Sequence, residues 1–464
     1  MTNSRPTKTG GRSATTGHIA GDYALAVGAS EEETPEGWSW RLLSDLARLE
    51  TGHTPSRRKP EYWNGDIPWI GIRDATGNHG RTLFDTAQHV TQAGIDNSSA
   101  RVLPANTVCL SRTASVGYVV VMGRPMATSQ DFVNWVCDPE KLDYRYLKYA
   151  LLAERASYSR FSHGTTHQTI YFPEVKAFHL LAPEADMQSA IADVLSALDD
   201  KIEQNRRTAR ALEYLARAIY RAWFVDFEPV KAKASGATAF PSMPQAVFDT
   251  LTTRFVDSDI GPVPEGWEVK AIGDVVSAKG GGTPSTKNPE YWDGGEHCWA
   301  TPKDMSRLSH PVLLDTERHI TDAGVNSISS GMLPVGTVLM SSRAPVGYLA
   351  IAGVSTAINQ GFIAMVCDGP LPPTYILNWA FTSMDAIKAR ASGTTFPEIS
   401  KKNFRPLPVV EPTADVIVAY QQVADPLFDL LVACVKEIEQ LAEMRDYLLP
   451  KLLSGEVRVE VAHD

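Results

Sequence analysis

The sequence of 464 residues is long enough for two or three domains, and its 43% apolar and 21% charged residues are close to the averages of globular proteins. Its formal net charge of −10 excludes a protein that holds nucleic acid through bulk positive charge, because such binding needs clustered Lys and Arg. Five scattered cysteines without a Cys-x-x-Cys pair support neither a disulfide framework nor a zinc site. We expect a cytoplasmic protein, because no apolar run approaches the roughly 18 residues of a membrane span and the N-terminus has no signal-peptide core.

Residues 1–34 are rich in Ser, Thr and Gly and are predicted to form a disordered tail. Two similar domains follow along the chain, at residues 35–185 and 263–412. Both begin with Pro-Glu-Gly-Trp, at 35–38 and 264–267, an offset of 229 residues. Further matches are Thr-Pro-Ser at 54–56 and 283–285, Pro-Glu-Tyr-Trp at 60–63 and 289–292, Val-Gly-Tyr at 116–118 and 346–348, and Val-Cys-Asp at 136–138 and 366–368. Short runs of Val, Ile, Tyr and Trp between Gly, Pro, Asn and Asp predict a mixed α/β fold for each copy.

Residues 186–228 are predicted to form a long helix. Its apolar or small residues recur at alternating spacings of four and three, which is the pattern of a coiled-coil seam. Asn205 takes one seam position, where it either fixes the register of a helix pair or is a tolerated polar residue. The other seam positions are Ile191, Leu195, Leu198, Ile202, Ala209, Leu212, Ala216, Ile219 and Trp223.

Residues 229–262 contain four prolines and are predicted to be a linker, and a second long helix is predicted at 413–455, followed by a C-terminal tail at 456–464. Pro426 either kinks this helix or begins a fresh one that is capped by Asp425. A long amphipathic helix cannot leave its stripe in water, so we expect the two helices to pair antiparallel. The second stripe is Val423, Leu427, Leu430, Cys434, Ile438, Leu441, Met444 and Leu448.

The chain also contains four distinctive motifs. Two of them lie in the domains: the Thr-Pro-Ser loop that leads to Tyr-Trp and Gly at 54–65 and 283–294, and Asn-Gln-Gly-Phe at 359–362, which is weakened to Ser-Gln-Asp-Phe at 129–132. The other two end the helices, at 222–229 and 448–455. In these motifs and in its layout, the chain after residue 34 resembles the specificity subunits of type I restriction-modification enzymes, although Pro426 departs from the family pattern.

The resemblance implies a mixed α/β fold in which two similar target-recognition domains are separated by two long antiparallel coiled-coil helices, in a pseudo-twofold internal repeat. It implies a non-catalytic subunit that reads a bipartite target in double-stranded DNA. The helices would set the spacing of the half-sites and bind two modification (methyltransferase) subunits, and two restriction (endonuclease and translocase) subunits would complete the complex. S-adenosylmethionine, ATP and Mg would be held by these partner subunits, and no cofactor by this chain.

Two other functions remain open: a protein-binding scaffold, and an orphan or anti-restriction subunit without DNA-specific activity. An enzyme is disfavoured, because the sequence contains neither a Gly-x-x-x-x-Gly-Lys-Ser/Thr phosphate loop nor the Asn-Pro-Pro-Tyr motif of an amino-methyltransferase.

Sequence-specific DNA binding needs donors and acceptors that reach base edges and phosphates. The basic run at 57–59 is either such a site or a solvated turn, and Arg112 and Arg343 either contact DNA or brace a turn. The candidate DNA-binding residues are Arg57, Arg58, Lys59, Arg73, Arg112, His163 and Thr165 in the first copy, and Lys287, Lys303, Arg343, Thr394, Lys401 and Lys402 in the second.

Four repeated tryptophans, Trp63, Trp69, Trp292 and Trp299, are assigned to the core rather than to base stacking. His163 and His167 stand four residues apart without a clear third ligand, so no metal site is predicted there.

Overall fold

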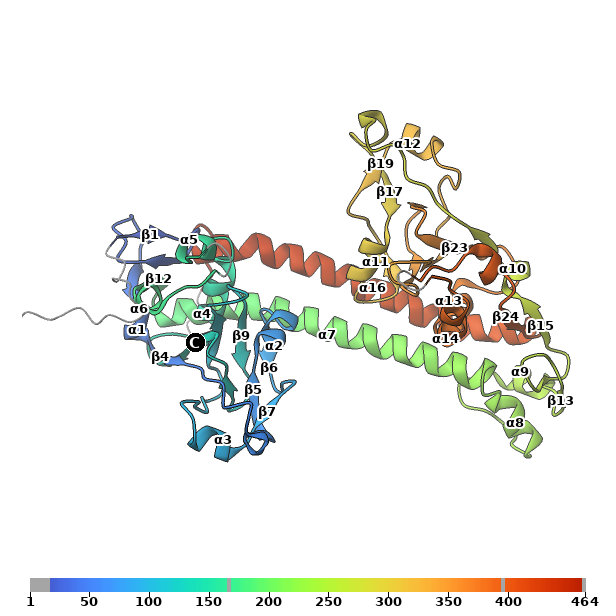
Figure 1. Cartoon of the computed structure of the whole chain (residues 1–464), viewed down its shortest axis with the longest axis horizontal. Helices are drawn as coiled ribbons and strands as arrows, with labels where there is room; N and C mark the ends of the chain where they lie inside the picture. The colour runs from blue at the N-terminus through green and yellow to red at the C-terminus, as the bar shows by residue number, and fades with distance from the viewer. Residues whose placement is uncertain (1–16, 165–167, 394–396, 461–464) are drawn as a thin grey trace, which may run out of the picture. The chain divides into compact units, whose positions relative to one another are not determined.

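The computed structural model describes residues 17–164, 168–393 and 397–460 (Figure 1). The chain divides into two compact units, of which the first is Met1–Ile202 with Gln440–Asp464 and the second is Glu203–Glu439. Each unit contains one copy of the sequence repeat and one end of each of the two long helices.

The described part of the first unit contains three β-sheets. The five-stranded sheet has the order β4-β11-β8-β9-β6, the four-stranded sheet β1-β2-β12-β3, and the three-stranded sheet β10-β5-β7. Neighbouring strands are antiparallel except for the pairs β6 with β9 and β10 with β5. The strands are β1 (Ile19–Ala20), β2 (Leu25–Val27), β3 (Trp38–Leu42), β4 (Ala47–Thr51), β5 (Trp63–Ile70), β6 (Thr82–Leu83), β7 (His89–Val90), β8 (Val108–Ser111), β9 (Val119–Met122), β10 (Ala127–Thr128), β11 (Phe132–Cys137) and β12 (Phe178–Pro183).

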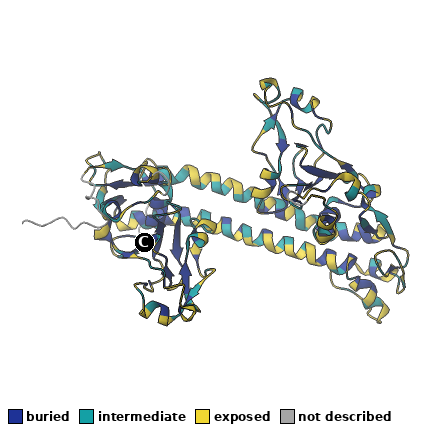
Figure 2. Cartoon of the chain, viewed as in Figure 1, coloured by how far each residue is buried: buried dark blue, intermediate teal, exposed yellow. Residues whose placement is uncertain are grey.

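Both faces of the five-stranded sheet are covered, as the buried strands in Figure 2 show. Because side chains alternate along a strand, β8 contributes to two cores: Val108 and Leu110 to one that contains helix α4, and Cys109 to another. The short helices of this unit are α1 (Leu43–Leu46), η1 (Pro60–Tyr62), α2 (Ile72–Gly77), α3 (Gln92–Asp96), α4 (Tyr144–Ala153), α5 (Tyr158–Phe161) and α6 (Phe172–Lys176).

The predicted disordered tail is wrong for residues 17–34. Strand β2 is fully buried and pairs with both β1 and β12. The segment before it is held by Glu154, a buried carboxylate that accepts backbone N–H groups from Asp22 to Leu25 at 2.7–3.1 Å. The local composition, rich in Gly and Ser, does not predict this strand. Its burial depends on β12 and Glu154, which are more than 120 residues away in the chain.

The second unit repeats this topology. Its five-stranded sheet has the order β16-β23-β20-β21-β18, its three-stranded sheet β19-β17-β22, and two-stranded sheets join β13 to β14 and β15 to β24. The predicted internal repeat is therefore confirmed in the fold. The strands are β13 (Phe255–Val256), β14 (Val263–Pro264), β15 (Glu268–Ala271), β16 (Ser277–Lys279), β17 (His297–Ala300), β18 (Val312–Leu313), β19 (His319–Ile320), β20 (Val338–Ser341), β21 (Leu349–Ala352), β22 (Thr356–Ile358), β23 (Phe362–Val366) and β24 (Pro408–Glu411).

Short helices also occupy equivalent places in the second unit. Helix α13 packs against β20 and β21 as α4 packs against β8 and β9. These helices are α10 (Ile272–Val275), η2 (Pro289–Tyr291), α11 (Pro302–Arg307), α12 (Asp322–Asn326), α13 (Pro373–Thr382), α14 (Met384–Ala389) and α15 (Lys401–Phe404).

The segment predicted as a linker, residues 229–262, is part of the second unit's core. It contains helices α8 (Glu228–Ala234) and α9 (Gln245–Thr250) as well as β13. Val230 and Phe248 are buried in the main core of the unit. The prolines lie at helix starts and turns, so they shape the segment without preventing its packing.

The two long helices, α7 (Ala185–Phe224) and α16 (Ala414–Leu453), each contain 40 residues. In the first unit, Asp199 of α7 binds Arg445 of α16 at 3.0 Å, and Ile191 shares a core with Leu452. Sequence numbers rise along one helix as they fall along the other, so the ends that meet in this unit are antiparallel.

The same antiparallel pairing holds in the second unit. Ala209 packs with Leu431 and Cys434, and Asn205 donates from Nδ2 to Glu437 Oε2 at 2.8 Å. Asn205 is buried and has a specific partner on the facing helix, which is what a residue that fixes register requires.

The seam of α16 differs from the prediction near its centre. Leu430 is 50% exposed and Met444 is 52% exposed, whereas Leu431 is buried. An α-helix with 3.6 residues per turn drifts relative to a strict heptad, so two successive steps of four carry the seam from Val423 through Leu427 to Leu431. The predicted seam residues Leu198, Leu212, Leu427, Ile438, Leu441 and Leu448 are half-buried, and Ile191, Leu195, Ile202, Ile219 and Trp223 are buried.

Helix α16 runs through Pro426 without a break, so the prediction of a fresh helix at this residue is wrong. Asp425 accepts a hydrogen bond from Thr374 Oγ1 at 2.7 Å. By length and composition alone α16 would be able to cross a bilayer, but 33% of its most apolar stretch is buried inside the protein.

Candidate nucleic-acid interface

In both units the Thr-Pro-Ser loop is joined to the central motif. Thr283 Oγ1 donates to Gln360 Oε1 at 2.6 Å, and in the first unit Thr54 binds Gln130 in the same way. A Cβ on Gly281, which precedes the loop, would lie 2.0 Å from the carbonyl oxygen of Ile358. Only glycine allows this close approach. The two motifs therefore form one structural feature, which explains why both recur in the two copies.

The repeated tryptophans shape the same loop. Trp292 Nε1 donates to Ser285 O at 3.1 Å, and Trp299 Nε1 donates to Gly282 O at 3.0 Å. Trp63 and Trp69 make the equivalent bonds in the first unit, and each pair packs edge to face. Their indole N–H groups are thus bound to protein, and Trp69 and Trp299 are 4% exposed.

One arginine lies over each tryptophan pair, but the two arginines come from different positions in the repeat. In the first unit Arg57 lies 4.4 Å from the Trp63 ring and donates to Gln88. In the second unit Arg318, the equivalent of Gln88, lies 3.5 Å from the Trp292 ring. Sequence reasoning missed Arg318, since only the aligned repeat indicates it. Arg57 packs on this aromatic pair and is not a freely solvated basic side chain.

The central motif of the second unit borders an open hollow of about 490 Å³. Asn359 and Gly361 line it, together with two of the predicted DNA-binding residues, Lys303 at the start of α11 and Arg343 in the β20–β21 turn. Hydroxyl groups add further donors and acceptors. The hollow is therefore lined by a lysine, an arginine and the side-chain amide of Asn359. Its other lining residues are Thr301, Pro302, Ser306, Ala344 and Tyr348.

Both cations of the hollow have carboxylate partners. Lys303 Nζ lies 2.9 Å from Glu317, and Arg343 lies 3.8 Å from Glu398. The hydrogen bond from Lys303 is the main cause of the lowered pKa of Glu317. These pairs are solvent-exposed and screened by water, so they are weak and a DNA phosphate or base would compete with them easily.

The predicted basic residues of the first unit occupy different environments. Arg58 and Arg73 are exposed and make no ion pair within the described part of the chain. Lys59 donates to Tyr62 Oη at 2.9 Å, and this bond raises its pKa. Arg112 is half-buried, lies 4.5 Å from the Phe172 ring and donates to Gln130 O at 3.3 Å, while burial lowers its pKa. Arg112 therefore braces the central motif, whereas Arg58 and Arg73 are available to a ligand.

The remaining candidates of the first unit lie near a gap in the described residues. His163 Nε2 is 3.4 Å from Glu174 Oε1, and its ring stacks on Tyr171. Thr165 and His167, like Thr394 in the second unit, lie outside the described residues.

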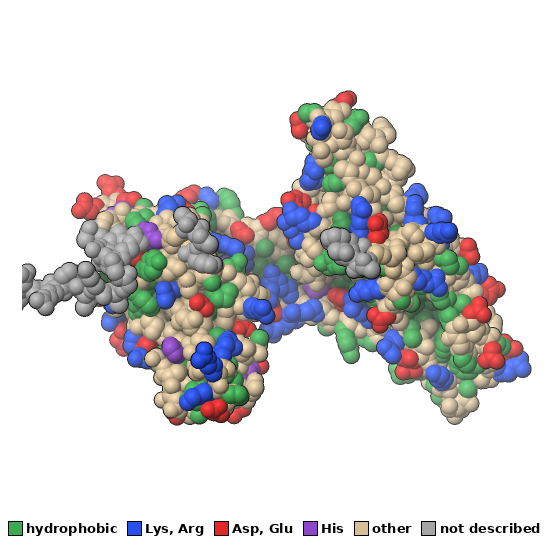
Figure 3. Space-filling model, in the orientation of Figure 1, with side chains coloured by type: hydrophobic (Ala, Val, Ile, Leu, Met, Phe, Trp, Pro, Cys, Tyr) green, Lys and Arg blue, Asp and Glu red, His purple; other side chains and the backbone are tan. Residues whose placement is uncertain are grey.

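The remaining candidate lysines of the second unit, Lys287, Lys401 and Lys402, are exposed. Lys287 lies in the Thr-Pro-Ser loop, and Lys401 and Lys402 begin helix α15 after the Ser400 cap. On the face drawn in Figure 3, Lys and Arg side chains are interspersed with Asp and Glu. Local groups of cations, and not a continuous basic surface, are therefore the candidate DNA contacts.

Comparison with known proteins identifies the family. A family model described as the type I restriction modification DNA specificity domain matches residues 35–214 and again 264–440. The chain belongs to this family, which confirms the resemblance found in the sequence.

Individual relatives agree with this assignment. The chain is 24% identical over 434 residues to the specificity subunit of the type I restriction enzyme MjaIX of Methanocaldococcus jannaschii, a match that covers 92% of this chain and 95% of the relative. It is 27% identical over 336 residues to the HindI specificity subunit of Haemophilus influenzae, covering 64% of this chain and 72% of the relative. The crystal structure of the S subunit of a type I system from M. genitalium shares the fold, with a TM-score of 0.56 at 16% identity, over 91% of this chain and 98% of that one.

Proposed function

We propose that this chain is the DNA-recognition subunit of a type I restriction-modification complex in the cytoplasm, and that it carries out no chemical step itself. Each unit reads one half of a bipartite target in double-stranded DNA. The observation that carries the proposal is the feature shared by both units: a Thr-Pro-Ser loop bound to the central motif, with different polar side chains at equivalent positions around it.

The hollow of the second unit has the chemistry of a base reader. Lysine and arginine donate to guanine O6 and N7 or to phosphate, and asparagine pairs with the edge of adenine. Lys303 and Asn359 provide these groups. At the aligned positions the first unit has Arg73 and Ser129, so we expect the two half-sites to differ in sequence.

The long helices carry the proposed contacts to partner subunits. In the second unit Tyr214 is 78% and Leu215 46% exposed, and in the first unit Tyr447 is 64% exposed. Large apolar side chains on an exposed helix face favour protein binding. We propose that two modification subunits dock on these faces and that two restriction subunits join them. S-adenosylmethionine, ATP and Mg belong to those partners in this proposal.

The proposal is tested by expressing the full chain with the modification subunit of its system in a host that lacks adenine methylation. Single-molecule sequencing then maps methyladenine across the genome. We expect a split motif with a gap of fixed length that disappears when the chain is omitted. Methylation that persists without the chain, or a stable complex that methylates no defined motif, would favour the scaffold or orphan functions.

A pair of variants tests the hollow itself. Lys303→Ala removes one reader, and a good base contact is worth about 1–3 kcal/mol, or roughly 5- to 150-fold in binding. Lys231→Ala, on the exposed face of α8, is the matched control. We expect Lys303→Ala to relax one half-site only, while Lys231→Ala leaves the motif unchanged. Equal loss in both variants would assign the effect to net charge.

A further inference from the structure

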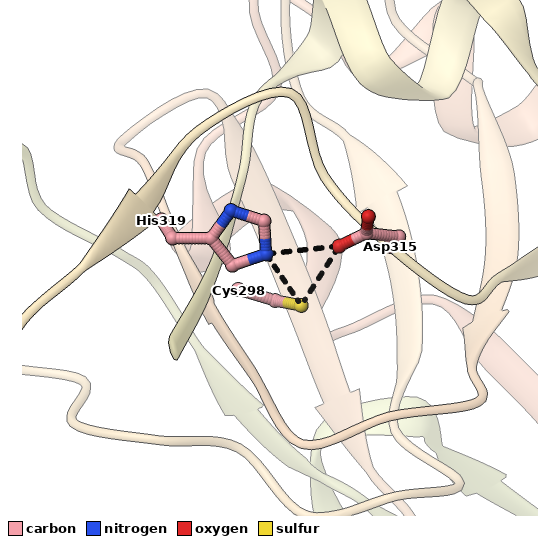
Figure 4. A group of neighbouring side chains, drawn as sticks. All are labelled: Cys298, Asp315 and His319. Carbon is pink, nitrogen blue, oxygen red and sulfur yellow. Dashed lines mark hydrogen bonds and ion pairs between the residues drawn. The ribbon is translucent and has the colours of Figure 1, made fainter. Parts of the chain in front are cut away.

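Three side chains of the second unit converge beside its three-stranded sheet (Figure 4). Cys298 lies on β17, His319 on β19, and Asp315 between β18 and β19. Cys298 Sγ is 3.5 Å from Asp315 Oδ1 and 3.7 Å from His319 Nε2, and His319 Nε2 is 2.9 Å from Asp315 Oδ1. A sulfur, a nitrogen and an oxygen thus face one common point.

The arrangement differs from that of a nucleophilic cysteine. In a catalytic relay the histidine contacts the nucleophile with one ring nitrogen and the carboxylate with the other. Here the same atom, His319 Nε2, faces both Cys298 and Asp315. All three atoms lie within 3.7 Å of one another, which is close enough for them to share one cation.

We propose that Cys298, Asp315 and His319 form a site for Zn²⁺. Zinc binds thiolate, imidazole and carboxylate at about 2.0–2.3 Å in tetrahedral geometry, which places neighbouring ligand atoms roughly 3.5 Å apart. Both distances from the sulfur agree with this spacing, and the His319 to Asp315 contact needs to open by about 0.5 Å. The thiolate selects zinc over Mg²⁺ or Ca²⁺.

The surroundings of the three ligands suit a partly open zinc site. The Thr316 N–H donates to Asp315 Oδ1 at 2.8 Å, which orients the carboxylate as outer partners orient metal ligands. Asp315 is exposed, whereas Cys298 and His319 are half-buried. Water therefore has access to the fourth coordination position.

The first unit contains a natural control at the aligned positions. His89 Nε2 binds Asp85 Oδ1 at 2.7 Å, as His319 binds Asp315. His89 pairs with Pro68 across β5 and β7, in the register in which His319 pairs with Cys298 across β17 and β19. Proline replaces the sulfur ligand, so the first unit has only two of the three ligands and the site is specific to the second unit.

Zinc would fix the segment that supplies other groups to the interface. Residues 315–319 include Glu317, which pairs with Lys303 of the hollow, and Arg318, which lies over Trp292. A cation bound at both Asp315 and His319 would tie both ends of this segment to β17. The proposed role is therefore structural support of the second unit, independent of whether that unit reads DNA.

The experiment uses the purified full chain, stripped of metal with a chelator and titrated with Zn²⁺ and, for spectroscopy, with Co²⁺. We expect one equivalent of tightly bound zinc and, with cobalt, a thiolate-to-metal charge-transfer band together with the visible bands of tetrahedral Co²⁺. Cys298→Ser and His319→Asn should lose the equivalent and the charge-transfer band. His89→Asn, the matched change in the first unit, should keep both.

A second measurement uses no variant, so its result does not depend on whether a variant folds. Cys298 is alkylated in the unmodified chain with and without Zn²⁺, and the labelled peptides are quantified by mass spectrometry. We expect zinc to slow labelling of Cys298 at least tenfold and to leave Cys137 unchanged. Zinc uptake that Cys298→Ser retains, a cobalt spectrum without the thiolate band, or labelling of Cys298 that is unaffected by zinc would overturn the proposal.

Discussion

The buried carboxylate of Glu154 allows a quantitative test of how the N-terminal segment is held. Its two oxygens accept the backbone N–H groups of residues 22–25 and the Ser157 hydroxyl, and the side chain is fully buried. Glu154→Gln keeps one acceptor oxygen but turns an amide NH₂ towards the Asp22 N–H and Ser157. A lost hydrogen bond to a charged acceptor costs about 1.5–3 kcal/mol, so we expect about 2–3 kcal/mol of destabilisation, with Glu154→Ala costing more.

Hydrogen exchange followed by mass spectrometry measures this effect in the full chain, where a single unfolding transition is not expected for two units. A loss of 2–3 kcal/mol predicts amide exchange in residues 22–27 that is roughly 30- to 150-fold faster. Glu184→Gln, an exposed glutamate in the same unit, is the control. Exchange in Glu154→Gln as slow as in the unmodified chain would refute the reasoning, because it would mean that the segment is held without this carboxylate.

Three further perturbations have defined outcomes. Burial, followed by two nearby arginines, lowers the pKa of His79 from 6.5 to about 4. The contribution of His79 to the stability of the first unit should therefore be fully present above pH 6.5. It should fall by at most about 2 kcal/mol, after allowance for solvent screening, as the pH falls towards 4. His79→Gln should abolish this part of the pH dependence when urea unfolding of the first unit is followed, and an identical pH profile in the variant would contradict the assignment. Thr283→Val removes the bond to Gln360 and should weaken recognition of one half-site about 5- to 10-fold in methylation assays, whereas equal loss at both half-sites would argue against a local effect. Asn205→Ala removes the bond to Glu437 and should lower the stability of the helix pair by about 1–2 kcal/mol, measured by hydrogen exchange of the α7 and α16 amides near this bond. Unchanged exchange there would mean that the bond adds nothing to the pair.

The architecture was predictable from the sequence because its signals are periodic or repeated. Identical tetrapeptides at an offset of 229 residues predict two copies of one fold, and a spacing of four and three predicts the helices to within a few residues of α7 and α16. The sequence-based predictions are wrong where contacts between residues far apart in the chain determine the structure more strongly than the local composition does. Strand β2 is three residues long and depends on Glu154, and the shift from Leu430 to Leu431 depends on helical drift that a heptad count ignores.

The candidate sites were less predictable, because strand pairing creates them. Cys298 and His319 are 21 residues apart and match no standard zinc spacing, yet pairing of β17 with β19 places them side by side. The hollow similarly joins residues that are up to 60 positions apart, from Thr301 to Gly361. Of the lining residues, the sequence predicts only Lys303 and Arg343 as DNA contacts, because a basic residue near a motif can be recognised without knowing its neighbours; Asn359 and Gly361 are recognisable only as part of the central motif.

The two units share one framework and differ in the side chains around it, which under the proposed function would let them read two different half-sites. The bond between the Thr-Pro-Ser loop and the central glutamine is the same in both, as are the tryptophan pairs. The cation over those tryptophans comes from Arg57 in one unit and from Arg318 in the other, so the same space is filled from two positions in the repeat. Under the proposed function, base preference would depend on where a donor is placed in three dimensions, so the sequence position of a residue alone would not assign the base that it reads, even between two copies in one chain.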